Sequence, residues 1–396
     1  MKVLLITFPE RVDLINFFAS DQENDYFLLN YSTNKTSGSN ISFLKGSENI
    51  NDHKFISKWV KKINPDRIVF FESSDIRLVF LNIIFTSLGY KLVFLDHGIR
   101  EIKSMQFVRS IEKEVMKNNE DHLKVIPKKK TLLLFFETIY HLPRKQFFSL
   151  CKILVDFLGH WNKERLFNKL LNLGNSFWRQ IIYCTNNLEV ISLTVKIEED
   201  KVFYTGFPSS DSYFPLKKND DSDYIVFIDH PYLETGIYTI EQHRKIVIAL
   251  KELSLSKEKK IFVKLHPKTI VENWSQYDLG SNLEIVSDFP PPSFYLNASM
   301  IISFSSTMLI NFLSKKKNVV LLSWYLDESH LGNDFSKLGV CHLSNNLDDL
   351  KVKFDYWISH NLAEEDLNNW EMFIKLFNYP FDGKATKRVL EAIHSS

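Results

Sequence analysis

The segment IFVKLHP (residues 261–267) decides the fold, because a short apolar run ends abruptly in a His-Pro pair. Such a run is typical of a buried parallel strand, and a proline stops the ladder of strand hydrogen bonds. A second apolar run, IISFSS (301–306), ends in a serine pair after roughly 40 residues, the length of one strand-loop-helix-strand unit. We therefore expect both strand ends to meet at one edge of a parallel sheet, where open α/β folds bind ligands.

Similar apolar runs, separated by longer mixed segments, extend in both directions from this segment. They predict strands at 2–8, 26–31, 67–72, 91–96, 181–185, 202–206, 224–228, 261–265, 283–286, 300–304 and 319–324. Apolar segments at 78–88, 240–253 and 306–313 predict helices. With an Asp-rich turn at 219–223, the pattern predicts an α/β fold of two Rossmann-like βαβ domains, 1–220 and 221–396, facing a central cleft. This organisation resembles the GT-B architecture of glycosyltransferases.

The composition narrows the class of protein. A chain of 396 residues exceeds what one hydrophobic core usually serves, which agrees with two domains. The net charge of +1 gives no global electrostatic argument for nucleic acid binding. The three cysteines lie far apart and predict neither disulfides nor a zinc site, so we expect a cytoplasmic protein. The first apolar run is too short for a signal peptide, and no run suits a transmembrane helix.

The segment from about 101 to 182 differs from the rest because it is basic and rich in bulky apolar residues. Residues 101–180 contain 15 Lys and Arg against 8 Asp and Glu, together with aromatic pairs at 135–136 and 147–148. Such a mixture suits peripheral contact with an anionic inner membrane or a large anionic acceptor. The simpler interpretation is a set of amphipathic helices that cover the sheet, and both interpretations stay open.

His266 is the first candidate for chemistry. It follows a predicted strand, and Pro267 favours an extended conformation before it, so we expect the imidazole to point from the sheet edge. Lys264 faces the same side by the two-residue strand period. A cation beside a titratable hydrogen-bond donor suits a phosphate, and a histidine there can stabilise a departing phosphate. The alternative is a histidine that merely caps a loop carbonyl.

Ser305, Ser306 and Thr307 form the second candidate group, between a predicted strand and a predicted helix. Free backbone N–H groups and hydroxyls at a helix N-terminus favour an anion, so these residues are predicted to bind phosphate. An N-cap alone is the alternative. Ser293 follows three prolines, where it is expected to cap another helix and shape a base or ribose pocket.

Asp96 and His97, followed by Gly98, end the predicted strand at 91–96 in the first domain. In a two-domain cleft this edge would face His266, and either side chain can take a proton from an acceptor hydroxyl. Neighbouring strand residues point to opposite faces, so we expect only one of the two to reach the site. A solvated turn with an aspartate cap is the alternative.

Two further strand ends, Gly206-Phe207-Pro208 and Asp229-His230-Pro231, are expected to be structural rather than catalytic. The chain contains no GxGxxG, Walker, HExxH or GxSxG motif, which argues against dehydrogenases, nucleoside triphosphatases, zinc proteases and esterases.

In order along the chain, Asp-x-Gly at 96–98, His-Pro at 266–267 and Ser-Ser at 305–306 resemble the motifs of bacterial GT-B sialyltransferases and polysialyltransferases. The resemblance implies that Asp96 is the general base, that His266 supports departure of CMP and that the serines bind its phosphate. It also implies an inverting transferase without metal or other cofactor. Its substrates would be a nucleotide-activated donor, a CMP-linked acidic sugar, and a cell-surface glycan acceptor of capsule or lipooligosaccharide.

A second family is also similar, the CDP-glycerol and polyol-phosphate transferases of teichoic acid-like synthesis. The relevant segments are His-Gly at 97–98, Gly-Phe-Pro at 206–208, His-Pro at 266–267 and Phe-Ser-Ser at 304–306. This resemblance implies that His97 is the base. A third hypothesis is a non-catalytic GT-B module that binds a glycan or partner enzymes.

Overall fold

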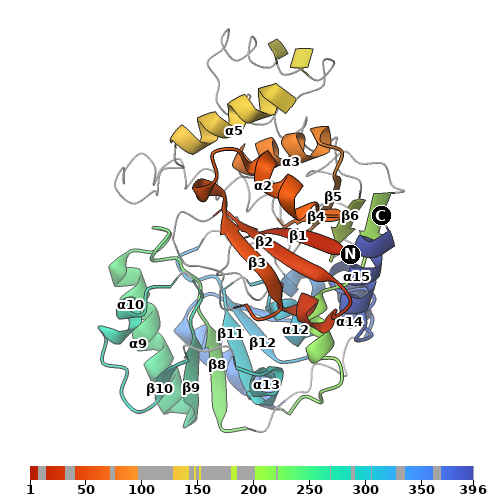
Figure 1. The fold of residues 1–396 in the computed structure, drawn as a ribbon. Coiled ribbons are helices and arrows are strands. Elements are labelled where there is room, and N and C mark those ends of the chain that lie inside the picture. Colours follow the sequence, from red (N-terminus) through yellow and green to blue (C-terminus); the bar gives the residue numbers. More distant parts are fainter. Residues whose placement is uncertain are drawn as a thin grey trace.

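The computed structural model contains two parallel β-sheets with helices on their faces (Figure 1). It describes residues 1–7, 15–31, 41–71, 76–96, 128–141, 147–148, 151–152, 180–184, 201–219, 222–267, 269–286, 290–304, 306–326, 335–359 and 367–395. Of the predicted site residues, His97 and Ser305 lie outside these ranges, as does Gly98.

The first sheet has seven strands in the order β3-β2-β1-β4-β5-β6-β7. The strands are β1 (Lys2–Thr7), β2 (Asp25–Asn30), β3 (Leu44–Asn49), β4 (Arg67–Phe70), β5 (Lys91–Leu95), β6 (Gln180–Tyr183) and β7 (Val202–Tyr204). The described helices of this half are η1 (Asn16–Ser20), η3 (Ile50–Asp52), α2 (Ile56–Ile63), α3 (Ile76–Ser87) and α5 (Lys128–His141). All six strand pairings are parallel, so the carboxyl ends of these strands share one edge.

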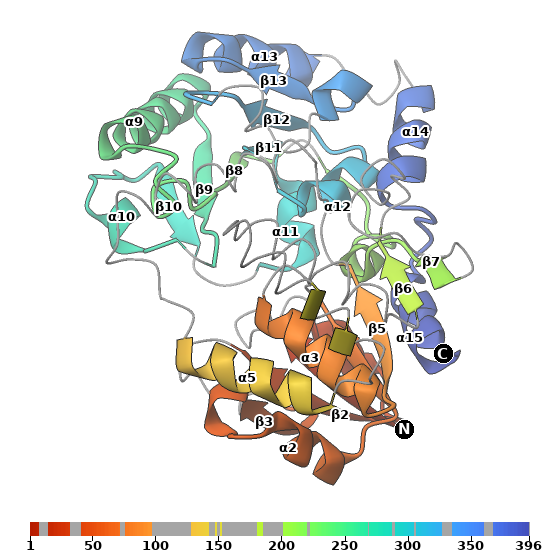
Figure 2. The same cartoon turned by 90° about the horizontal axis from the view of Figure 1, so that it is seen from above.

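The second sheet has six strands in the order β10-β9-β8-β11-β12-β13, again all parallel. The strands are β8 (Tyr224–Ile228), β9 (Lys260–Lys264), β10 (Leu283–Val286), β11 (Met300–Ser303), β12 (Val319–Leu322) and β13 (His342–Ser344). The helices are α9 (Ile240–Lys257), α10 (Glu272–Ser275), α11 (Pro292–Asn297), α12 (Leu309–Ser314), η6 (Phe335–Leu338), α13 (Leu347–Ser359), α14 (Leu367–Phe377) and α15 (Ala385–Ser395). Figure 2 shows α11 and α12 on the side of this sheet that lies toward the first.

Both sheets bury apolar side chains on two faces, because successive strand residues point to opposite sides and both sets are apolar. In β1, Leu4 and Ile6 pack with α2, α3 and α5, whereas Val3 and Leu5 join a different cluster. In β8, Ile225 and Phe227 pack beneath α9, while Val226 and Ile228 join the same cluster as Val3. One apolar core therefore extends from the inner face of one sheet to the inner face of the other.

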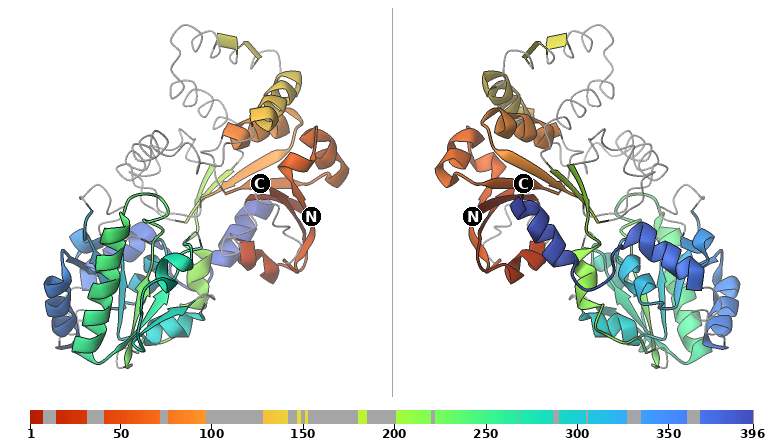
Figure 3. Two further views of the ribbon diagram at one scale, coloured as in Figure 1. Left: turned by 90° about the vertical axis from the view of Figure 1, so that its left-hand side faces the viewer. Right: turned by 90° about the vertical axis from the view of Figure 1, so that its right-hand side faces the viewer.

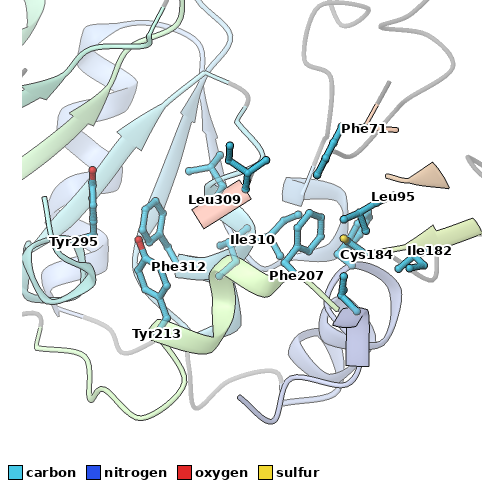
Figure 4. Close-up of a cluster of buried hydrophobic side chains, with 14 of the residues drawn as sticks. Phe71, Leu95, Ile182, Cys184, Phe207, Tyr213, Tyr295, Leu309, Ile310 and Phe312 are labelled. Atoms are coloured by element: carbon cyan, nitrogen blue, oxygen red, sulfur yellow. The ribbon is translucent and has the colours of Figure 1, made fainter. Parts of the chain in front are cut away.

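Figure 4 shows part of this shared core at the junction. Leu95 of β5 and Cys184, just after β6, lie close to Phe207 of the connecting segment, and Leu309 and Ile310 of α12 belong to the same cluster. The carboxyl edge of the first sheet is thereby packed toward the start of α12.

The segment between the sheets is held by buried polar contacts. Ser210, in η5 (Pro208–Ser212), donates to Asn311 Oδ1 at 2.6 Å and accepts from Asn378 Nδ2 at 2.9 Å. Asn378 Oδ1 also accepts the backbone N–H of Phe207 at 3.1 Å. Gly206 precedes this segment with φ +75°, and a Cβ there would lie 3.1 Å from the Pro380 carbonyl oxygen. The Gly-Phe-Pro turn therefore has a structural role, as expected from the sequence.

Helix α15 returns from the second half of the chain to the first sheet (Figure 3). Both carboxylate oxygens of Asp211 accept its first backbone N–H groups, from Ala385 at 2.9 Å and from Thr386 at 2.7 Å. Near its other end, His394 Nε2 lies 3.2 Å from Asp21 Oδ2 in the loop before β2. The last helix thus connects the interdomain segment with the first sheet.

Helix α5 is the described core of the predicted basic aromatic segment. Its inner face is buried at Leu134, and the carboxylate of Glu137 accepts the N–H groups of Ile56 and Ser57 at the start of α2. Its outer face exposes 62% of Phe136 and 84% of Tyr140. The helix therefore packs against α2 and α3 and not directly against the sheet, where the simpler interpretation placed it, and it also presents aromatic rings outward. In the described part of the chain, no helix is both long and apolar enough to cross a membrane.

Candidate functional site

The predicted donor motifs lie on strands that flank β8. In the second sheet β8 pairs with β9 on one side and with β11 on the other. His266 follows β9, and Phe304 follows β11. The parallel arrangement therefore brings the ends of the His-Pro and Ser-Ser strands to one edge, as the sequence predicted, with the end of β8 between them.

His266 lies half-buried at this edge and packs against a neighbour from β8. Ile228 is in register with Lys264, and the backbone N–H of Asp229 donates to the Lys264 carbonyl at 2.9 Å. Two residues further, the rings of His230 and His266 stack with centroids 5.6 Å apart and planes 22° apart. The segment after His266 turns at once, because the Thr269 N–H donates to the His266 carbonyl at 2.8 Å.

Asp229, the residue before His230, carries a buried carboxyl group. Thr269 donates its hydroxyl to Asp229 Oδ2 at 2.6 Å, which fastens the loop after His266 to the end of β8. Burial, together with the nearby negative charge of Glu234, raises the pKa of Asp229 to about 7, against the lowering effect of the Thr269 hydrogen bond. This carboxyl therefore changes charge near neutral pH, whereas an ordinary aspartate is fully ionised there.

Lys264 is buried rather than extended from the edge. Its Nζ donates to the carbonyl oxygen of Leu265 at 2.7 Å, so the ammonium group lies beside the backbone of its own strand. Pro267 is exposed. Contact of these two residues with a donor stays a prediction.

The end of β11 is tied to β8, since the Ser303 hydroxyl donates to the Ile228 carbonyl at 3.2 Å. Ser306 and Thr307 are half-buried, and Ser306 Oγ accepts the Met308 N–H at 3.3 Å. Helix α12 begins at Leu309, not at Ser306 as predicted. The residues before α12 form turns with hydrogen bonds between residues three apart, and an α-helix needs bonds between residues four apart. These bonds run from the Leu309 N–H to the Ser306 carbonyl and from the Ile310 N–H to the Thr307 carbonyl.

The prediction that Ser293 caps a helix is wrong. The helix is α11, and its N-cap is Pro291, which makes no side-chain cap. Pro292 takes the first helical position, which its fixed φ favours, so Ser293 falls inside the first turn and is exposed. Contact of Ser293 with a donor stays a prediction.

Asp96 lies at the carboxyl edge of the first sheet, directly after β5, and is buried. Its N–H donates to the Ile182 carbonyl at 2.9 Å, and its carbonyl accepts the Cys184 thiol at 3.0 Å. Burial, together with the negative charge of Asp96, raises the pKa of the Cys184 thiol well above its usual range. Leu95, its neighbour, belongs to the shared core that includes Leu309, so Asp96 follows a strand that packs toward α12.

Asp229 and His230 belong to the edge although the sequence favoured a structural role. A signal was present: Asp229-His230-Pro231 contains a second His-Pro pair at a strand end, like His266-Pro267. The two pairs are neighbours only because β8 and β9 are adjacent in the sheet, and local sequence patterns do not contain this strand order. Among the described residues, no three His, Cys, Asp or Glu side chains gather as a metal site would require.

The family model described as Alpha-2,8-polysialyltransferase (POLYST) matches residues 29–321 of the chain. This range includes the strand ends that carry Asp96, His230 and His266, and it also includes the serine pair. No curated protein sequence matches the chain significantly.

Solved structures share the fold at low sequence identity. A variant of the wall teichoic acid polymerase TagF is 12% identical with a TM-score of 0.58, covering 100% of this chain and 88% of that one. The UDP-GlcNAc 2-epimerase from Neisseria meningitidis bound to UDP-GlcNAc is 14% identical with a TM-score of 0.54, covering 100% of both chains. The glycosyltransferase of kitacinnamycin is 10% identical with a TM-score of 0.53, covering 99% of both. The predicted α/β, GT-B fold class is confirmed.

Proposed function

Because the chain belongs to the alpha-2,8-polysialyltransferase family and is a glycosyltransferase, we propose that it moves sialic acid or a related acidic sugar from a CMP-linked donor to a hydroxyl of a cell-surface glycan. The reaction inverts the anomeric centre and uses neither a metal nor another cofactor. The observation that carries the proposal is the location of His266 at the same sheet edge as the end of β11, with the end of β8 between them, within the range that the family model matches.

In the proposed reaction an acceptor hydroxyl oxygen forms a bond to the anomeric carbon of the sugar. Asp96 or His97 takes the proton of that hydroxyl, and the bond between the anomeric carbon and the CMP phosphate oxygen breaks. The electron pair leaves with the phosphate of CMP. His266 donates a hydrogen bond to this phosphate, aided by the hydroxyls of Ser305, Ser306 and Thr307, which lowers the cost of charge on the leaving group.

The direct test is incubation of the purified protein with CMP-sialic acid and a sialylated oligosaccharide acceptor. We expect CMP release that depends on the acceptor and that continues when EDTA is present. A parallel reaction with CDP-glycerol measures the competing activity. Turnover of CDP-glycerol alone would refute the sialyltransferase proposal.

A CDP-polyol transferase is the second candidate function. The four segments at 97–98, 206–208, 266–267 and 304–306 favour it, and the TagF polymerase shares the fold. In that reaction His97 is the base, so replacing His97 abolishes turnover while replacing Asp96 leaves most of it. The reverse result supports Asp96 as the base of the sialyl transfer.

We also propose that the enzyme works on the cytoplasmic side of the inner membrane, with the outer face of α5 toward anionic lipid. Phe136 and Tyr140 are exposed there, the described pair Phe147 and Phe148 follows, and three lysines open the helix at 128–130. Exposed aromatic rings combined with basic charge favour a membrane interface. The three free cysteines are compatible with a reducing compartment.

A further inference from the structure

The end of β8 occupies the middle of the proposed donor site, because β8 lies between the His-Pro strand and the Ser-Ser strand. We propose that His230 is a second histidine that binds the phosphate of the donor, side by side with His266. The inference rests on the proposed function for the identity of the donor. It adds a binding group at a position that the sequence indicated as structural.

The register of the two strands places both imidazoles together. Ile228 pairs with Lys264, and two residues beyond this pair the chain reaches His230 after β8 and His266 after β9. Both histidines therefore lie just beyond the strand ends, where their rings stack at the carboxyl edge of the sheet. Tyr232, which stacks on His230, belongs to the apolar cluster beneath α9.

The rings form part of a continuous row across the edge. His230 stacks on His266 at 5.6 Å and on Tyr232 at 4.4 Å, and the Tyr232 ring packs against Phe304 at 5.2 Å. Phe304 immediately precedes the serine pair. The row therefore links both predicted phosphate-binding segments, and His230 stands inside it.

The surroundings of the row favour an anion over a purely apolar contact. His230 and His266 are both half-buried, which leaves part of each ring accessible to a ligand. Each imidazole carries an N–H group that can donate a hydrogen bond to a phosphate oxygen, so the stacked pair offers two donors to one anion. Asp229 on β8, Glu234 in the following loop and Lys264 on β9 are the charged groups nearby that the structure describes.

The alternative is that His230 only packs between Tyr232 and His266. Two variants separate packing from binding. His230→Phe keeps an aromatic ring in the row but lacks the N–H groups, whereas His230→Asn keeps a hydrogen-bonding group but loses the ring. His342→Asn is the matched control. His342 is also half-buried, but it is the first residue of the edge strand β13 and therefore lies away from the carboxyl ends of β8 and β9.

Calorimetric titration with CMP, cytidine and pyrophosphate gives the decisive measurement. For His230→Phe we expect the affinity for CMP and for pyrophosphate to fall roughly tenfold to a hundredfold, the usual effect of losing a hydrogen bond to a charged group. Cytidine affinity is expected to stay unchanged, because cytidine has no phosphate. His342→Asn should bind all three probes like the wild type.

The outcomes are distinct. The inference is refuted if His230→Phe binds CMP as the wild type does, if CMP and cytidine weaken equally, or if the wild type binds neither CMP nor pyrophosphate. Binding of pyrophosphate that depends on His230, without binding of CMP, supports the inference and contradicts the proposed CMP donor. If His230→Asn fails to fold, His230→Phe alone decides the question.

Discussion

At the scale of single residues, the pKa of Asp229 predicts how the stability of the protein depends on pH. Burial raises this pKa from 3.8 to about 7. Between these values the folded chain keeps a proton that the unfolded chain has lost. The free energy of unfolding therefore falls as the pH rises through this window, by up to ~1.4 kcal/mol per pH unit. Asp229→Asn removes this contribution and keeps an oxygen for Thr269.

Urea denaturation of both proteins between pH 5 and pH 8 checks this prediction. The stability of Asp229→Asn relative to the wild type is expected to increase with pH up to about pH 7 and to level off above it. Asp348→Asn, on an exposed position of α13, should show no such trend. A constant difference between Asp229→Asn and the wild type would mean that the carboxyl is ionised throughout.

His266→Ala tests the proposed leaving-group contact. We expect CMP release to slow by a factor of roughly 10² or more, since general acid–base groups contribute about that much. The thermal unfolding temperature should stay close to that of the wild type, because the side chain is half-buried at a sheet edge. His342→Ala is the control for loss of an imidazole elsewhere. A variant that unfolds would show that His266 has a structural role instead.

Strand ends could be recognised from sequence because a polar or proline-containing pair follows an apolar run. Asp96 and His266 both carry this signal, and the structure places Asp96 directly after β5 and His266 two residues after β9. His230 carries the same local signal, yet its neighbour in space depends on the order β9-β8-β11, which local patterns do not contain. The Ser293 prediction failed for a local reason, because Pro292 was already suited to the first turn.

At the scale of elements, the outer face of α5 predicts membrane binding. Phe136 and Tyr140 lie one turn apart and are exposed, so replacing both by serine should abolish most flotation with vesicles that contain phosphatidylserine. Tyr379→Ser, an exposed aromatic position after α14, is the matched control. Equal flotation of the double variant and the wild type, or no flotation of the wild type, would contradict the proposed membrane contact.

The central strands were predictable because they are buried on both faces. The run at 224–228 coincides with β8, and the run at 300–304 extends one residue beyond β11. The edge strands β3 and β13 were missed, since β3 reads LKGSEN and β13 has only three residues. An edge strand has one partner strand and needs little apolar sequence, so its hydrogen bonds with that partner establish it.

At the scale of the whole molecule, Asp211 controls how the last helix is attached. Asp211→Ala leaves the N–H groups of Ala385 and Thr386 without their acceptor, which should cost about 1–2 kcal/mol. We expect α15 to detach more often and limited proteolysis near residue 384 to become faster. Thr239→Ala also removes a helix cap, but on α9, which lies within the second half alone. It should leave cleavage near residue 384 unchanged, and equal cleavage in both variants would contradict the assignment to Asp211.

Two domains could be inferred from length and strand pattern, and two separate sheets confirm that organisation. The bounds 1–220 and 221–396 stay a prediction. The sequence contained no signal that α15 would pack against η5 and β6, which belong to the first half. Its apolar positions read as an ordinary amphipathic helix, and such a pattern identifies a buried face without identifying its partner.

The packing of α15 against the first sheet has a consequence for how the protein folds during its synthesis on the ribosome. Val389 and Ile393 belong to the same core as Val3 and Leu5, although they are translated after every strand of both sheets. The first sheet can pair its strands early, but its inner face stays open to water and to chaperones until α15 has emerged. Synthesis that stops short of α15 therefore releases a first half whose inner apolar face lacks its final cover.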